Sequence, residues 1–159
     1  MIKKRWLVAD FFAGVGGIRM GFEKAGFKTI FANDFDKTCK ETYDLNFDEP
    51  KLNTEDIQNF EISSIPDFNI LAAGFPCQSF SIAGYRRGFK DKKRGGNLFF
   101  RIIEILKEKR PEAIFLENVK NLKGHDDGNT FRIIKGLLES FGYQLKVDIL
   151  NSKTYGNLP

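Results

Sequence analysis

The sequence predicts an α/β fold built on a doubly wound, mostly parallel sheet. Short apolar runs alternate with segments whose apolar residues recur at helical spacing, which is typical of parallel strands joined by helices. Of the 159 residues 42% are hydrophobic, which suffices for the core of one domain. We therefore treat residues 1–159 as a single domain.

The first half of the chain is expected to form three strands and two helices. The strands are expected over 6–10, 28–32 and 69–73, and the helices over 17–25 and 36–45. In the first helix, Ile18, Gly21, Phe22 and Ala25 recur at helical spacing, and Gly26 ends the helix. Each strand with the helix after it fits one unit of a parallel sheet.

The second half of the chain continues this alternation. An amphipathic helix is expected over 97–109, ahead of Pro111, and a short apolar strand over 113–116. A further helix is expected over 130–141, followed by a last strand over 143–150.

The net charge of +4 is unevenly distributed. Residues 84–95 hold six basic side chains against Asp91 alone, so this segment carries +5 and the rest of the chain sums to −1. A basic loop flanked by glycines on a near-neutral body indicates a contact for phosphate. On charge alone, a solvated surface loop is the favoured alternative.

Several other features limit the setting of the protein. Cys39 and Cys77 lie in different local contexts, so no disulfide framework is expected and a reducing cytoplasm is the default. No apolar run is long enough to span a bilayer, and the N-terminus does not resemble a signal peptide. His125 has no second histidine or free cysteine near it in the sequence, so no metal site is expected.

A glycine-rich turn after the first strand is the first candidate site. The run from Phe12 to Gly17 reads FAGVGG, and its glycines let the backbone approach a ligand before the helix begins. The spacing is not G-x-G-x-x-G, which disfavours a nicotinamide cofactor. Asp34, at the tip of the second strand, can bind two ribose hydroxyls. These features predict a nucleoside-containing cofactor, with a tight turn beside a surface acid as the alternative.

A cysteine and a glutamate form the second candidate site. Cys77 follows the strand over 69–73, and Glu117 follows the next strand along the chain. Strands joined by a helix are commonly neighbours, so the thiol and the carboxyl are expected to converge at the carboxyl edge of the sheet. The alternatives are a buried small apolar cysteine for Cys77 and a helix-capping or surface acid for Glu117.

These motifs together resemble the DNA cytosine-C5 methyltransferase family, particularly its small bacterial modification enzymes. Phe-x-Gly-x-Gly-Gly, Pro-Cys-Gln and Glu-Asn-Val occur in the family's order and spacing, and the likeness runs from about Leu7 to Pro159. The resemblance implies the Rossmann-like fold of S-adenosylmethionine-dependent methyltransferases and S-adenosyl-L-methionine as cofactor. The matched cofactor-binding positions are Phe12, Gly14, Gly16, Gly17, Asp34, Phe35, Asp56, Ile57, Gly74, Pro76 and Leu98, although ordinary core is the alternative for Phe35 and Leu98.

The resemblance also implies a mechanism. Cys77 would attack C6 of cytosine, Glu117 would hold a proton at N3, and C5 would then take the methyl group. The base must first be flipped out of double-stranded DNA. The matched DNA-binding positions are Gln78, Ser81, Arg86, Arg87 and Lys90.

Members of the family normally continue into a further core strand and a target-recognition region, so the chain is expected to be the N-terminal catalytic part. A truncated chain, a proteolytic remnant and one subunit of a split enzyme remain open, the last with a second polypeptide as partner. A role in restriction-modification is a family-level expectation, and the DNA sequence recognised is not readable. A tRNA cytosine-C5 methyltransferase and an inactive cofactor-binding fragment are the alternative functions.

Overall fold

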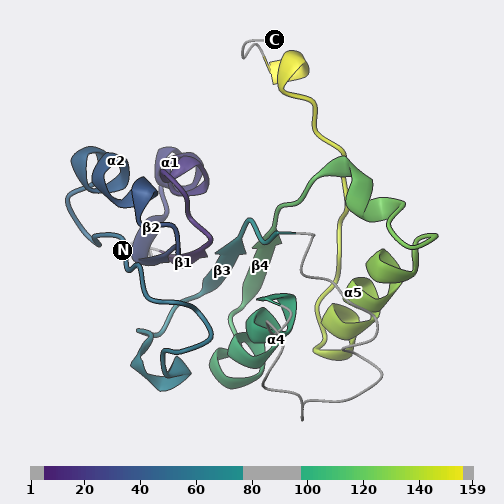
Figure 1. Cartoon of the computed structure of the whole chain (residues 1–159). Coiled ribbons are helices and arrows are strands. Elements are labelled where there is room, and N and C mark those ends of the chain that lie inside the picture. The colour runs from purple at the N-terminus through teal and green to yellow at the C-terminus, as the bar shows by residue number, and fades with distance from the viewer. Residues whose placement is uncertain (1–5, 77–97, 156–159) are drawn as a thin grey trace, which may run out of the picture. The chain divides into compact units, whose positions relative to one another are not determined.

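The computed structural model describes residues 6–76 and 98–155 (Figure 1). Contacts divide the chain into two compact units, Met1–Asn118 and Val119–Pro159, and each is described by itself. The strands of the first unit are β1 (Leu7–Phe11), β2 (Lys28–Asn33), β3 (Ile70–Ala73) and β4 (Ala113–Leu116). Its helices are α1 (Gly17–Lys24), α2 (Thr38–Asn46), α4 (Leu98–Lys109) and the short 3-10 helix η1 (Ile62–Ser64).

The four strands form one parallel sheet in the order β2-β1-β3-β4, which Figure 1 shows side by side. The chain moves outward from β1 to β2, then returns to the other side of β1 and moves outward again from β3 to β4. The direction of winding therefore reverses between β1 and β3, and open α/β sheets bind ligands at the carboxyl ends of the strands at such a point. The predicted fold class is confirmed.

One face of the sheet packs against α1. Val8, Ile70 and Ala72 form a buried cluster, and Ile18 and Phe22 of α1 pack against it. These two residues are one turn apart, so the helical spacing seen in the sequence places both on the buried stripe. Burying each such large apolar side chain contributes about 1.5–3 kcal/mol to folding.

Aromatic side chains occupy the other face. The ring of Phe11 lies 5.6 Å from that of Phe31 and 6.4 Å from that of Phe68, and Phe31 meets Phe60 at 6.0 Å. Arg101 of α4 donates hydrogen bonds to the carbonyl oxygen of Phe60 and to that of a neighbouring residue. The segment between β2 and β3 is thereby connected to both the sheet and α4.

The second unit contains η4 (Lys120–Lys123), α5 (Asn129–Ser140) and η5 (Ser152–Tyr155). Thr130, Ile134 and Leu138 are the buried residues of α5 and recur every four positions, as an amphipathic helix requires. His125 Nδ1 lies 2.7 Å from Thr130 Oγ1, a contact that closes the loop before the helix.

The strand predicted over 143–150 is wrong. Residues 143–150 have no regular secondary structure, and Val147, Ile149 and Leu150 are 44%, 53% and 69% exposed. A β-strand forms only where a neighbour accepts and donates its ladder hydrogen bonds, and the described part of the second unit contains no other strand. The other predicted elements are present, and their ends agree with the predicted ones to within two residues.

Candidate cofactor and catalytic site

Three backbone positions with positive φ shape the turn between β1 and α1. Phe12 has φ 58°, Gly14 has φ 53° and Gly16 has φ 92°. Glycine adopts these angles without penalty, whereas Phe12 is a strained exception of the kind found at functional sites. No side chain caps α1, so the N–H groups of its first turn can attract an anionic ligand group.

Asp34 connects the tip of β2 to this turn. Its Oδ2 accepts a hydrogen bond from the Gly14 N–H at 2.8 Å, and its Oδ1 accepts one from the Asp36 N–H at 2.8 Å. Asp34 is therefore more than the surface acid that the sequence left as an alternative. Each carboxylate oxygen has two lone pairs, so both oxygens retain capacity for a ribose hydroxyl.

The remaining cofactor candidates of the first unit differ in exposure. Phe35 beside Asp34 is 66% exposed, which excludes ordinary core for this ring, whereas Leu98 at the start of α4 is partly buried. Asp56 Oδ1 accepts a hydrogen bond from the Gln58 N–H at 3.0 Å. Ile57 is 2% exposed, and its carbonyl oxygen accepts a hydrogen bond from Arg101 Nε at 2.8 Å.

Glu117 lies at the carboxyl edge of the sheet, beside the segment that follows β3. Its N–H donates to the Ala73 carbonyl at 2.9 Å, and the Asn118 side chain donates to the Phe75 carbonyl at 2.5 Å. The pairing of β3 with β4 confirms the neighbour relationship predicted for the strands that lead to Cys77 and Glu117.

Gly74 brings the two candidate sites together. A Cβ placed on Gly74 would lie 3.4 Å from Glu117 Oε2, 3.5 Å from Ile18 Cδ1 and 3.9 Å from the Phe12 carbonyl oxygen. The turn after β1, the start of α1 and the Glu117 carboxylate therefore surround one glycine at the switch point of the sheet.

Of the other predicted site residues, the structure describes Pro76. Pro76 is exposed at the end of the segment that follows β3. The candidate nucleophile and the candidate DNA contacts lie outside the described residues; these are Cys77, Gln78, Ser81, Arg86, Arg87 and Lys90.

Two residues near the turn were missed at the level of sequence. Asp10 in β1 is buried, and neither of its carboxylate oxygens accepts a hydrogen bond from the part of the chain that the structure describes. Burial raises the pKa of Asp10 from 3.8 to about 7, the charge of Asp34 adds to this rise, and Arg19 opposes it. Arg19 in α1 is 3% exposed, and its guanidinium group donates hydrogen bonds to the carbonyl oxygens of Glu49 and Pro50. The sequence did contain a signal for each residue: Asp10 is an acid in an otherwise apolar strand, and Arg19 is an arginine within an amphipathic helix.

The described residues fit a cofactor that carries a nucleoside and a charged tail. Asp34 offers hydrogen-bond acceptors for ribose, Phe35 offers an exposed aromatic face, and the uncapped first turn of α1 offers N–H donors. Among residues 6–76 and 98–155, no cluster of three His, Cys, Asp or Glu side chains could hold a metal ion. Over the same residues, no helix is long and apolar enough to cross a membrane.

Bacterial methyltransferases are similar to nearly the whole chain. Type II methyltransferase M.Bsp6I of Bacillus sp. (strain RFL6) is 53% identical over 96% of this chain and 48% of its own length. M.NgoBI of Neisseria gonorrhoeae is 49% identical over 92% of the chain and 45% of its own length. M.HhaI of Haemophilus parahaemolyticus is 43% identical, again over 92% of the chain, and over 44% of its own length. The chain thus spans about half the length of these curated relatives.

Solved structures share the fold. The DNMT2 mutant of Spodoptera frugiperda has a TM-score of 0.61 at 24% identity, over 83% of this chain and 41% of its own. The methyltransferase EhMeth of Entamoeba histolytica has a TM-score of 0.64 at 22% identity, over 87% of this chain and 44% of its own. The family model for C-5 cytosine-specific DNA methylase matches residues 7–158. This chain therefore belongs to the C-5 cytosine-specific DNA methylase family.

Proposed function

We propose that this chain is the cofactor-binding and catalytic part of an enzyme that transfers a methyl group from S-adenosyl-L-methionine to C5 of cytosine in duplex DNA. Family membership supports the reaction, and the names of the type II relatives support a role in restriction-modification. The observation that carries the proposal is that the Glu117 carboxylate lies beside Gly74. Gly74 stands three residues before Cys77 in the sequence and lies next to the glycine turn.

The cofactor, when bound, supplies an electrophilic methyl group on a sulfonium. Asp34 would accept hydrogen bonds from the ribose, the ring of Phe35 would cover the adenine, and the Gly14–Gly17 turn would receive the amino-acid tail. Each Asp34 carboxylate oxygen accepts one backbone N–H, which leaves it the capacity to accept a further hydrogen bond from a ligand. These residues would hold the cofactor at the carboxyl edge of the sheet, where it would supply its methyl group.

The chemistry on the base would be carried by Cys77 and Glu117. The thiolate of Cys77 bonds to C6 of cytosine while Glu117 gives a proton to N3, and the C5–C6 electron pair becomes available at C5. C5 would then take the methyl group that the sulfonium of the bound cofactor supplies, with the demethylated thioether as the leaving group. A base then removes the C5 proton, the C6–S bond breaks, the double bond re-forms and N3 returns its proton to Glu117.

Access to C6 requires that the cytosine leave the base stack. We infer that the basic segment over 84–95 holds the phosphates around the flipped nucleotide, with Gln78 and Ser81 near the base. Replacing Arg86, Arg87 and Lys90 together by Gln should weaken DNA binding and flatten its dependence on salt. An unchanged salt dependence would rule out phosphate contacts by this segment.

The first test is calorimetric titration of the chain with S-adenosyl-L-methionine, with adenosine triphosphate as a control ligand. Selective binding supports the cofactor assignment. Because the chain spans about half of its relatives, we infer that methyl transfer needs the region corresponding to their other half, in the same polypeptide or as a partner. Transfer to duplex DNA by the completed enzyme, with none to tRNA, supports the proposed substrate. Transfer to tRNA alone contradicts it.

A further inference from the structure

The strongest feature that the proposed function leaves unused is the buried side chain of Arg19. It belongs to the first turn of α1, directly after the glycine turn, and is 3% exposed. Its guanidinium group makes several hydrogen bonds, and three of the acceptors lie 24 to 31 residues away in the sequence. An arginine buried in this way either stabilises the fold alone or holds a functional segment in place.

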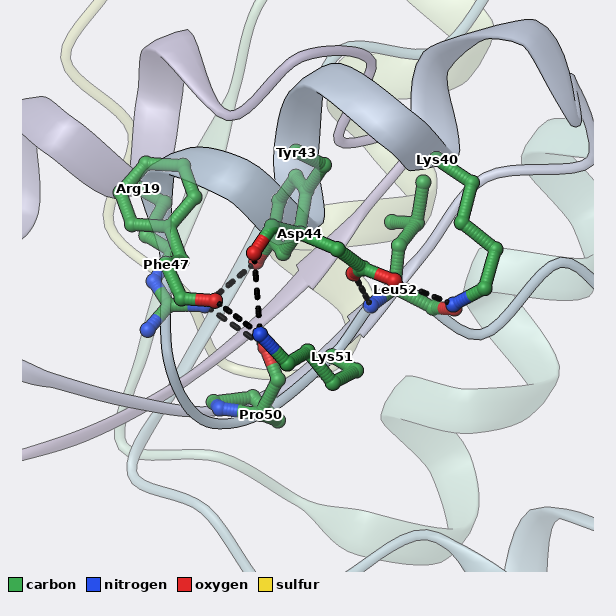
Figure 2. Close-up of polar contacts among 8 residues, drawn as sticks. All are labelled: Arg19, Lys40, Tyr43, Asp44, Phe47, Pro50, Lys51 and Leu52. Atoms are coloured by element: carbon green, nitrogen blue, oxygen red, sulfur yellow. Dashed lines mark hydrogen bonds and ion pairs between the residues drawn. The ribbon is translucent and has the colours of Figure 1, made fainter.

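Arg19 binds the end of α2 and the loop after it. Nη1 donates to the Tyr43 hydroxyl at 2.9 Å and to the Pro50 carbonyl at 2.8 Å, and Nη2 donates to the Glu49 carbonyl at 2.7 Å. Nε donates to Glu23 at 2.8 Å within α1. Figure 2 shows Arg19 together with Tyr43 and Pro50. The planar fork of arginine is suited to this set of acceptors, whereas a lysine ammonium cannot reproduce it.

Arg19 also positions the ring of Phe47. The guanidinium carbon lies 4.2 Å from the centroid of the Phe47 ring, and the Tyr43 ring lies 4.8 Å from it. The loop that carries Phe47 is held a second time by Lys51 Nζ, which donates to the Phe47 carbonyl at 2.9 Å. Figure 2 shows this second connection as well. Phe47 is therefore held at two points: Arg19 contacts the face of its ring, and Lys51 binds its backbone carbonyl.

The ring of Phe47 in turn covers Gly16. A Cβ placed on Gly16 would overlap the Phe47 ring, so the ring lies directly against the glycine that caps α1. Gly16 has φ 92°, and its N–H donates to the Ala13 carbonyl at 2.8 Å, which closes the turn. Arg19, Phe47 and Gly16 thus form a continuous contact from the buried helix face to the turn.

We propose that Arg19, acting through Phe47, is a positioning residue that holds the Gly14–Gly17 turn in its cofactor-binding conformation. This inference rests on the proposed function, in which the turn receives the amino-acid tail of S-adenosyl-L-methionine. Preorganising a turn raises affinity because the cost of ordering it is not incurred on binding. Loss of the Arg19–Phe47 contact should therefore weaken binding of the amino-acid tail of the cofactor. Binding of its nucleoside, which is assigned to Asp34 and Phe35, should be unchanged.

The test compares S-adenosyl-L-methionine with 5′-methylthioadenosine, which keeps the nucleoside and the S-methyl group but lacks the amino-acid tail. In Arg19→Lys and in Phe47→Leu, affinity for the complete cofactor should fall about tenfold, while affinity for methylthioadenosine should stay within about twofold. Phe47→Leu leaves no altered buried charge and serves if Arg19→Lys fails to fold. Equal losses for both ligands, or no loss, would overturn the proposal.

Arg101→Lys is the matched control. Arg101 also donates to backbone carbonyl oxygens, those of Ile57 and Phe60, from the inner face of a helix. Its replacement should lower the melting temperature without changing the ratio of the two affinities. A changed ratio in Arg101→Lys would mean that the loss of another arginine bound to backbone carbonyls produces the same effect, which contradicts a specific role for Arg19.

Amide hydrogen exchange supplies a readout that needs no cofactor. In Arg19→Lys and Phe47→Leu, the N–H groups of Gly14 and Gly16 should exchange about tenfold faster than in the unsubstituted chain, and in Arg101→Lys they should not. Unchanged exchange would overturn the positioning role. Failure of the unsubstituted chain to bind S-adenosyl-L-methionine would instead overturn the proposed function, so the two failures are distinguishable.

Discussion

The carboxyl ends of β1 and β2 and those of β3 and β4 form two halves of one sheet edge, and the two halves are built differently. In the first half, the Asp34 carboxylate accepts two backbone N–H groups and ties two strand ends together. In the second half, the Glu117 N–H donates to the Ala73 carbonyl and the Asn118 amide donates to the Phe75 carbonyl. The Glu117 side chain is exposed and has no hydrogen-bond partner among the described residues.

We propose that this difference separates two tasks. A carboxylate whose oxygens already accept backbone hydrogen bonds is a rigid acceptor, suited to holding a ligand. A carboxylate with open oxygens is available to give and take a proton during a reaction. We therefore expect substitutions in the first half to affect cofactor binding, and substitutions in the second half to affect methyl transfer.

The largest effect is expected in the second half of the edge. Cys77→Ser should reduce methyl transfer by about a thousandfold or more, because a hydroxyl is a far weaker nucleophile than a thiolate. Glu117→Gln should reduce it by about a hundredfold or more, because the carboxyl proposed to give a proton to N3 would be missing. The measurement is single-turnover transfer to duplex DNA by the completed enzyme. Cofactor affinity should change by less than about twofold, and a parallel loss of affinity would contradict the separation.

A substitution in the glycine turn should have the next largest effect. Gly16→Ala places a side chain at φ 92° and against the Phe47 ring, and should lower the free energy of unfolding by about 2–3 kcal/mol. Gly21→Ala is the control, because Gly21 lies inside α1 with nothing within 4 Å of its Cβ position. This control should gain about 0.5–1 kcal/mol. Denaturant unfolding measures both, and equal values for the two variants would refute the turn geometry.

Removing the acid of the first half should weaken cofactor binding. Asp34→Ala leaves the Gly14 N–H without its acceptor and would remove the proposed ribose contact, so affinity for S-adenosyl-L-methionine should fall about 10- to 100-fold. Calorimetry measures the loss. Asp67→Ala removes an acid whose side chain is 99% exposed, and should leave the affinity unchanged. Unaltered binding in Asp34→Ala would show that this half does not hold the cofactor.

The smallest effect concerns the buried carboxyl of Asp10 and depends on pH. The pKa of Asp10 is raised from 3.8 to about 7 in the fold, chiefly by burial. Below the lower value both states are protonated, and as pH rises the unfolded chain ionises first, so the fold loses stability until about pH 7. Asp10→Asn should remove this loss and be more stable than the unsubstituted chain at pH 8 by about 1–2 kcal/mol.

The difference between the two chains should shrink or reverse at pH 4. Urea unfolding at both pH values checks the sign, with Asp67→Asn as an exposed control. A greater stabilisation by Asp10→Asn at pH 4 than at pH 8 would contradict a carboxyl that is held neutral by burial.

The order of strands and helices was predictable from the sequence, because apolar periodicity depends on residues that lie within a few positions of one another. The glycine turn was predictable for the same reason, since Gly14 and Gly16 there adopt positive φ angles that glycine reaches readily. The neighbour relationship of β3 and β4 also followed from local information, because consecutive parallel strands joined by one helix usually pair.

Contacts between distant residues were decided only by the tertiary structure. Asp34 binds Gly14 across 20 positions, and Arg19 reaches Pro50 across 31, through side-chain geometry that no local pattern encodes. The segment over 143–150 has a strand-like sequence but no strand, because a strand also needs a partner for its backbone hydrogen bonds. The sequence by itself thus determined which elements and motifs this chain carries, and the tertiary structure decided which of them support one another.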